Sequence, residues 1–186
     1  KGDIQYHQLP FFAHILKAFL LQLKVQENQS DALIRLSRTM LVCPGVMDVM
    51  MKLTFNTCHA RDLSEVSVAL AMFRSWIVSM GTWHERRSIS KFSLKSLNRL
   101  RMNTSFDFHY FFSALRILLR IDNPSQVTVK GIEFLYAIWD TIPQQQAEVL
   151  VRQLVESGAF TDLFLHWERE VRHFFVHLVA FRVLQI

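Results

Sequence analysis

The sequence predicts an all-α fold, and two observations support this prediction. First, apolar residues recur with the helical period of about 3.6 residues along most of the chain, and alternating strand-like patterns do not compete with it. Second, helix breakers are scarce, because the 186 residues include 5 Gly and 4 Pro, whereas 51% of the residues are hydrophobic and 16 are Phe. This composition predicts a folded hydrophobic core rather than a disordered chain.

The helical period divides the chain into about nine segments joined by short connections. Asp62 precedes an apolar run and has Glu65 three residues later, as in a capping box. Ser125 is placed to cap the helix that follows Pro124, and Gly158 is placed to end the helix before it. The predicted segments are Leu9–Gln26, Asp31–Val42, Gly45–Thr57, Asp62–Met80, Ser88–Met102, Ser105–Ile121, Gln126–Thr141, Pro143–Glu156 and Phe160–Leu184, the last with a break near His166.

The order and spacing of the segments predict a repeat architecture. Helix pairs recur about every 35 to 45 residues, which is the spacing of HEAT and armadillo units. No repeated residue signature accompanies this spacing, so a compact helical bundle is the alternative. We expect residues 1–186 to form a single helical-repeat-like domain, a HEAT/armadillo-like solenoid segment, and to be an excerpt of a larger protein.

The last segment is apolar on two flanks if it is one continuous helix. A helix of this kind is covered by neighbours on both sides, as an inner helix of a stacked array is. We therefore expect Trp167 to be buried, so that Trp167→Ala would leave a large cavity. One flank carries Trp167, Val171, Phe174, Phe175, Leu178 and Phe181, and the other carries Val176, Val179 and Val183.

Four polar residues of the same segment fall on one helix face: His166, Glu170, His173 and His177. Imidazoles and a carboxylate are suitable ligands for Zn²⁺. On a straight helix, however, His166 and His177 would be ~16 Å apart at about 1.5 Å per residue. Only His173 and His177, with or without Glu170, could share an ion. We interpret the four residues as a polar seam between apolar flanks and predict no metal or cofactor site.

Catalytic motifs are absent from the sequence. It contains no Gly-rich phosphate loop, nucleophile elbow, kinase motif set or zinc-protease motif. Cys43 and Cys58 lie in apolar helical contexts without the cationic neighbours that activate a thiolate. The aromatic residues between Phe106 and Phe112 are interpreted as a buried central helix rather than a ligand-binding box. The chain is therefore predicted not to be an enzyme.

Residues 86–101 form the sharpest charge feature, because this window contains six cations and no acid. Lys91, Lys95 and Arg99 share one face of a predicted helix. Such a ridge can meet anionic lipid head groups or an acidic protein segment, and a solvated face is the other interpretation. Nucleic acid is disfavoured because the net charge of +5 is modest and no binding motif is present. The candidate partner- or lipid-binding residues are Arg86, Arg87, Lys91, Lys95, Arg99 and Arg101.

Hydropathy and cysteine content indicate a location. No run reaches the ~20 apolar residues that span a membrane, and no signal-peptide pattern is visible. The 2 Cys are too few for a disulfide framework. We therefore expect a cytoplasmic protein without a transmembrane segment, with the periphery of a membrane as a candidate location.

The segment near the C-terminus resembles a known family. It reads Phe164-Leu165-His166-Trp167-Glu168-x-x-Val171-Arg172-x-x-Phe175, and a weaker likeness runs from Gly131 to Asp140. These strings resemble the C-terminal signature of a eukaryotic, mainly fungal, family described as domain of unknown function seventeen sixty-five. The resemblance implies a helical, non-enzymatic module of large proteins, some of them described as membrane-associated, and it brings no catalytic residues.

Taken together, these features favour a non-enzymatic helical scaffold or adaptor that mediates protein–protein interaction, with a membrane surface as a candidate location. The alternative is a peripheral module that binds anionic lipid through the basic ridge at residues 86–101. The two hypotheses differ in whether a protein or a lipid is the partner.

Overall fold

The computed structural model describes residues 11, 14–18, 37, 39–41, 45–88 and 106–185, with the side chains of residues 79–88 excluded. Within these ranges the regular structure is helical and no strand occurs, so the all-α prediction is confirmed. The predicted segments at residues 9–26, 31–42 and 88–102 fall largely outside the described residues.

Most of the remaining segments end close to their predicted bounds. The helices are α3 (Val46–Asn56), α4 (Leu63–Ser88), α5 (Phe108–Leu118), α6 (Ser125–Ile138), α7 (Gln144–Glu156), α8 (Ala159–Phe164) and α9 (Arg169–Phe181), with 3-10 turns η2 (Trp139–Thr141) and η3 (Val183–Gln185). The prediction that the fourth segment ends at Met80 is wrong, because α4 continues to Ser88. Gly81 lowers helix propensity by about 1 kcal/mol, which a helix of 26 residues tolerates.

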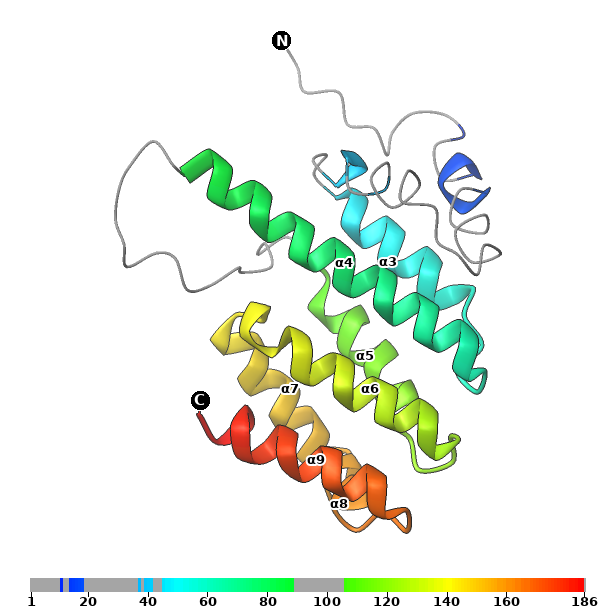
Figure 1. Ribbon diagram of the computed structural model, residues 1–186, viewed down its shortest axis with the longest axis vertical. Helices are drawn as coiled ribbons and strands as arrows, with labels where there is room; N and C mark the ends of the chain where they lie inside the picture. The colour runs from blue at the N-terminus through cyan, green and yellow to red at the C-terminus, as the bar shows by residue number, and fades with distance from the viewer. Residues whose placement is uncertain are drawn as a thin grey trace.

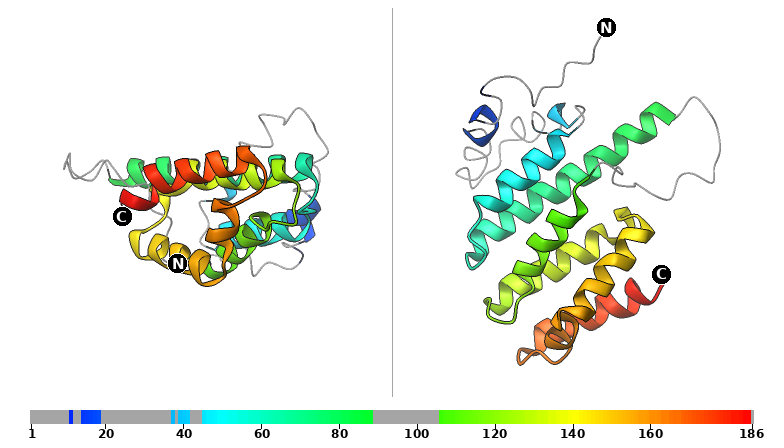
Figure 2. Two further views of the ribbon diagram at one scale, coloured as in Figure 1. Left: turned by 90° about the horizontal axis from the view of Figure 1, so that it is seen from below. Right: turned by 180° about the vertical axis from the view of Figure 1, so that it is seen from behind.

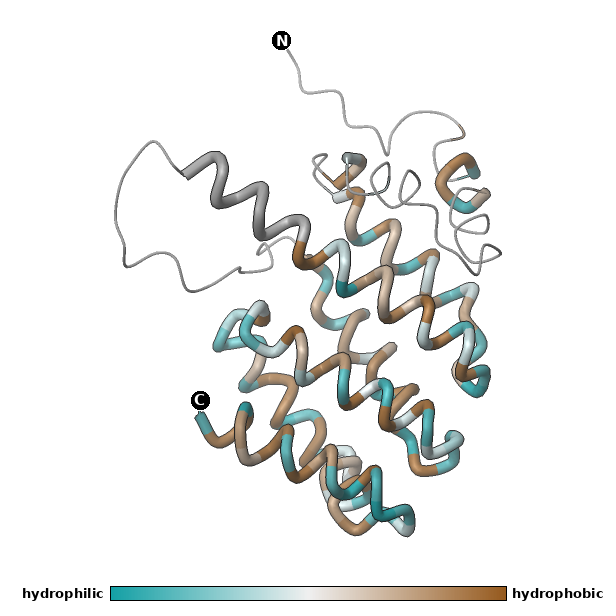
Figure 3. The backbone as a smooth tube through the Cα atoms, viewed as in Figure 1, coloured by the Kyte–Doolittle hydropathy of each residue, from teal (hydrophilic) through white to brown (hydrophobic). Residues whose placement is uncertain are grey.

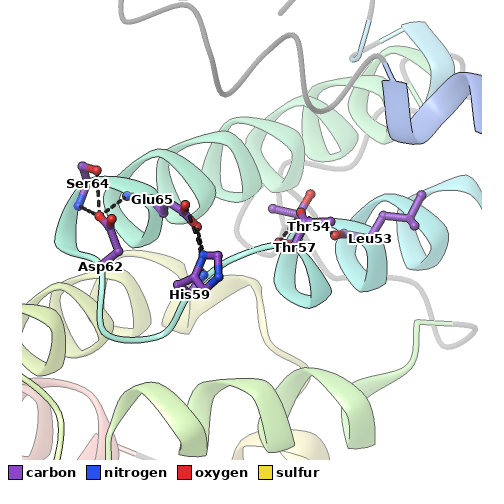
Figure 4. A network of polar contacts seen from close by, with 7 residues as sticks. All are labelled: Leu53, Thr54, Thr57, His59, Asp62, Ser64 and Glu65. Atoms are coloured by element: carbon purple, nitrogen blue, oxygen red, sulfur yellow. Dashed lines mark hydrogen bonds and ion pairs between the residues drawn. The ribbon is translucent and has the colours of Figure 1, made fainter.

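The turn between α3 and α4 shows how a cap begins a helix (Figure 4). One carboxylate oxygen of Asp62 accepts hydrogen bonds from the amides of Ser64 at 2.9 Å and Glu65 at 3.1 Å, as a cap residue should. The hydroxyl of Ser64 also donates to this oxygen, and this bond holds the pKa of Asp62 below its ordinary value. The carboxylate of Glu65 accepts from the amide of His59 at 2.9 Å, and the amide of Asp62 donates to the carbonyl of His59. Asp62 therefore caps α4 as predicted, but the reciprocal bond of a capping box is replaced by the bond to His59.

Two other predicted caps have different outcomes. The prediction that Ser125 caps α6 is wrong, because α6 begins at Ser125 itself and Pro124 occupies the cap position without a side-chain bond. Proline needs no amide partner there, which explains why the position suits it. Gly158 follows α7 with φ 77° and also precedes α8, so its left-handed conformation ends α7 as predicted.

The helices form two layers of antiparallel hairpins (Figures 1 and 2). Helices α4, α6 and α9 lie side by side in one layer, and α3, α5 and α7 lie in the other, with α8 linking α7 to α9. The turns of the hairpins lie along one side of the molecule (Figure 1). Arg61 in the first turn and Asp122 in the second approach to 3.5 Å between Nη2 and Oδ2.

Aromatic side chains fill the space between the layers. The ring of Phe73 on α4 lies 5.4 Å from Phe111 on α5 and 5.8 Å from Phe134 on α6, measured between centroids. Trp76 is 1% exposed and its Nε1 donates to the hydroxyl of Ser37 at 3.0 Å. The backbone in Figure 3 correspondingly alternates between polar and apolar residues along each helix. The core interpretation of the aromatic group is confirmed for its buried members, Phe106, Phe108, Phe111 and Phe112.

Candidate functional site

The predicted basic ridge lies outside the part of the structure that carries side-chain information. Arg86 and Arg87 belong to the C-terminal end of α4, where only the backbone is described. Lys91, Lys95, Arg99 and Arg101 lie outside the described residues. The ridge therefore stays a prediction from the sequence.

The structure instead places three exposed apolar side chains together at the turn between α8 and α9. Phe164 is 48% exposed, Leu165 is 70% exposed and Trp167 is 70% exposed. We refer to these three side chains as the apolar tip. Large apolar residues that gather at an exposed turn are unusual on a soluble surface and commonly mark an interaction site.

The tip corrects the prediction that Trp167 is buried. That prediction placed residues 164–182 on one helical wheel, but α8 ends at Phe164 and α9 begins at Arg169. Residues before Arg169 therefore do not share the phase of α9. In the intervening turn the polar residue His166 is 0% exposed, whereas its neighbour Trp167 faces outward.

Two side chains fix the backbone of this turn. Nδ1 of His166 accepts a hydrogen bond from the amide of Glu168 at 3.1 Å, so the neutral ring carries its proton on Nε2. Nη1 of Arg172 donates to the carbonyl oxygens of both His166 and Trp167, the latter at 3.0 Å. Nε2 of His166 is buried and has no hydrogen-bond partner in the described structure.

Ring contacts connect the tip to the core. The ring of Phe164 stacks on Phe160 with 6.4 Å between centroids, and Phe160 meets the buried ring of Phe175 edge-on at 5.1 Å. On the other side of the turn, the indole of Trp167 stacks on the imidazole of His166 at 5.5 Å. The tip is therefore an exposed surface that rests on well-packed residues.

Acidic residues flank the tip in the sequence. Between Glu156 and Arg172 the chain has four acids and two bases, Arg169 and Arg172, although the whole chain has a net charge of +5. Glu156, Asp162 and Glu170 are exposed, and Glu168 is partly exposed. The apolar tip thus lies in a stretch of sequence with a net charge of −2, from four acids and two bases.

The predicted polar seam is only partly preserved. His166 precedes α9 and is buried, so the prediction that it shares a helix face with Glu170, His173 and His177 is wrong. The rings of His173 and His177 lie 4.5 Å apart, and both side chains are exposed. Within the described residues, no group of three or more His, Cys, Asp and Glu side chains is placed to hold a metal ion.

The two predicted flanks of α9 are covered to different degrees. On the first flank Val171, Phe175 and Leu178 are buried, whereas Phe181 is 50% exposed. On the second flank Val179 and Val183 are partly buried against the core, whereas Val176 is 43% exposed. Helix α9 lies beside α6 (Figures 1 and 2), and among the described residues its second flank is covered only in part.

A second polar cluster, which the sequence did not reveal, joins α3 to α5. Nζ of Lys52 lies 2.6 Å from Oδ2 of Asp107, and this contact lowers the pKa of Asp107 and raises that of Lys52. The amide of Asp107 donates to Asp48 at 3.0 Å, and burial raises the pKa of Asp48. Because Asp107 also caps α5 by accepting from the amide of Tyr110, we assign the cluster a structural role.

A family described as "Protein of unknown function (DUF1765)" matches residues 47–183, which include every helix from α4 to α9 and nearly all of α3. The chain belongs to this family. The resemblance seen in the sequence is therefore confirmed, and the matched region includes the turn that carries the apolar tip.

One relative in the comparisons is a Schizosaccharomyces pombe protein with the name "UPF0592 membrane protein C7D4.03c". It is 34% identical over 82 residues, which are 44% of this chain and 9% of the relative's length. No solved structure matches the chain significantly. Among the described residues of this family member, every helix is too short or too polar to cross a bilayer.

Proposed function

We propose that the chain is a non-enzymatic helical scaffold that binds another protein through the apolar tip. The exposure of Trp167 carries this proposal, because an indole at 70% exposure contributes little to the core of its own chain. Tryptophan is among the residues that contribute most to protein interfaces. The tip is also preorganised, because His166 and Arg172 already hold its backbone, and ordering it on binding costs little entropy.

The layered hairpins support the scaffold part of the proposal. The antiparallel pairs α3–α4 and α5–α6 stack side by side, and α7, α8 and α9 complete a third pair beside them (Figure 2). In a HEAT/armadillo-like solenoid, each hairpin contacts its neighbours in this way, and the turns lie along one side. We propose that the chain is a segment of such a solenoid, which presents its α8–α9 turn to a partner.

Site-specific photocrosslinking tests protein docking at the tip. The photoreactive amino acid benzoylphenylalanine is incorporated in place of Leu165, and the protein is expressed in its native cells and irradiated. The crosslinked partner is then identified and purified, and its direct binding to the chain is measured. The matched control is Val78, which is 49% exposed on α4. We expect a discrete adduct from position 165 alone and direct binding that Trp167→Ala weakens. Adducts of equal yield from both positions would count against the proposal. So would binding of the purified partner that Trp167→Ala leaves unchanged.

A second candidate function is binding of anionic lipid through the basic ridge. The name of the fission yeast relative contains the words "membrane protein", and Lys91, Lys95 and Arg99 form the predicted cationic face. Each such cation contributes about 1 kcal/mol near an anionic membrane, so three give ~3 kcal/mol, which salt screens. Replacing all three residues with Gln should therefore reduce the fraction of the chain that floats with anionic vesicles. Unchanged flotation of that variant would remove this candidate.

A further inference from the structure

The charge around the apolar tip restricts the chemistry of its partner. Glu156, Asp162 and Glu170 are exposed and lie close to the three apolar side chains in the sequence. Residues 156–172 hold four acids and two bases, Arg169 and Arg172, so this stretch has a net charge of −2. An anionic membrane would bring its lipid phosphates close to these carboxylates, which costs free energy. A surface that combines apolar residues with flanking Lys or Arg would satisfy both features of the tip.

The backbone of the tip restricts the shape of the partner. The amide of Leu165 donates to Thr161 at 2.9 Å, and the amide of Glu168 donates to His166. The carbonyls of His166 and Trp167 accept from Arg172. An extended strand binds mainly through unpaired backbone groups, and the amides of Leu165, His166 and Glu168 and the carbonyls of His166 and Trp167 are already paired. A helix binds through its side chains alone, and it therefore suits this surface better.

We infer that the partner of the apolar tip is a basic amphipathic helix. Its apolar stripe packs on Phe164, Leu165 and Trp167, and the Lys or Arg residues beside the stripe approach Glu156, Asp162 and Glu170. This inference rests on the proposed protein docking at the tip and adds the chemical class of the partner. Helix-in-groove and helix-on-surface recognition both use such a stripe, with anchors spaced by three and four residues.

A pair of synthetic helices tests the inference. The first probe is a fluorescently labelled peptide of about 18 residues, or five helical turns, with Leu on one face and Lys on both flanks. The second has the same Leu positions with Glu in place of Lys. Fluorescence anisotropy with the intact chain measures binding of each probe. We expect the Leu–Lys peptide to bind and the Leu–Glu peptide not to bind.

Variants of the chain locate the binding. Trp167→Ala should weaken binding of the Leu–Lys peptide by about thirtyfold, as expected for a central aromatic anchor. Leu165→Ser provides a second variant, and melting curves establish that both remain folded. The triple variant Glu156→Gln, Asp162→Asn and Glu170→Gln should weaken binding about tenfold at low salt and much less at high salt. The control with Glu133→Gln and Glu148→Gln, on α6 and α7, should bind as the unchanged chain does.

Each other outcome contradicts the inference in a distinct way. Equal binding of the two peptides, or no binding of either, overturns the basic helix but leaves protein docking to be decided by the crosslinked partner. Trp167-dependent binding to zwitterionic vesicles without peptide binding identifies a membrane as the occupant and overturns both proposals. A concentration-dependent dimer in sedimentation that Trp167→Ala abolishes identifies a second copy of the chain as the occupant.

Discussion

The side chain of Arg172 holds the backbone of Trp167, because Nη1 of Arg172 donates to the Trp167 carbonyl oxygen at 3.0 Å. The indole of Trp167 is nevertheless 70% exposed. Arg172 lies in the first turn of α9 and therefore reaches back over the turn that precedes its own helix. The position of the indole is set without the indole being buried. The contributions of Trp167 to folding and to binding are thus separable by mutation.

Trp167→Ala should leave the stability of the chain nearly unchanged, within about 0.5 kcal/mol, because substitutions at exposed positions remove few contacts. Phe175→Ala provides the contrast, because Phe175 is 1% exposed and its loss should cost ~3–5 kcal/mol. Urea unfolding monitored by circular dichroism measures both. A large loss of stability in Trp167→Ala would mean that the indole is buried in solution and that the tip is not a docking surface.

Arg172→Ala should destabilise the chain by about 1–2 kcal/mol, because two carbonyl oxygens lose a charged donor. The effect should concentrate in the turn, so the amide of Glu168 should exchange its hydrogen faster. Arg172→Lys should recover little of the lost stability, since an ammonium lacks the planar fork of the guanidinium. Hydrogen exchange read by NMR measures the local effect, with Arg152→Ala on α7 as the control. Unchanged exchange at Glu168 would show that Arg172 does not hold the turn.

The sequence predicts the helices well where local chemistry marks their ends. Asp62, Pro124, Pro143 and Gly158 all lie at helix boundaries, and each acts through its own backbone or its nearest neighbours. The end of α4 is missed, since nothing after Gly81 forces a helix to stop there and the helix continues to Ser88. Local signals therefore predict the boundaries at which they are present.

The apolar tip could not be predicted in the same way. The stretch from Leu165 to Glu168 contains no Gly or Pro, and the break near His166 was expected without its consequence for the helical phase. The break is held by the ring of His166 and by Arg172, which bond to backbone groups only once the turn has formed. The acidic composition of residues 156–170 was readable in the sequence, and it could have drawn attention to this end of the chain.

Asp107→Asn should reduce the dependence of stability on pH in acid. The contact with Lys52 lowers the pKa of Asp107 in the folded chain, so this carboxylate stabilises the fold above its unfolded pKa of about 3.9. That stabilisation is lost as the pH falls through the lowered folded pKa. Asn retains the helix cap on the amide of Tyr110 and removes only the charge.

The measurement is urea unfolding of both proteins between about pH 7 and pH 2. The unchanged chain should be more stable than the variant at neutral pH, by less than about 1 kcal/mol because the ion pair is partly exposed. The difference should shrink on acidification. Asp107→Ala serves as the control for the cap and should cost about 1 kcal/mol more than Asn at every pH. A constant difference between Asn and the unchanged chain would show that the charge of Asp107 contributes nothing.

Gly158→Ala should destabilise the chain by about 1–2 kcal/mol, because its φ of 77° places a Cβ in the unfavourable left-handed region. No atom lies within 4 Å of that Cβ, so the cost is backbone strain alone. Asn tolerates this conformation better, and Gly158→Asn should therefore cost less than Ala. Gly131→Ala is the comparison inside α6, where a gain in helix propensity of about 0.8 kcal/mol opposes a Cβ contact of 3.2 Å with Leu119 Cδ2. Among these variants, Gly158→Ala should have the lowest melting temperature in thermal unfolding. If Ala and Asn at position 158 melt alike, the left-handed turn that connects α7 to α8 does not determine the stability of this end of the molecule.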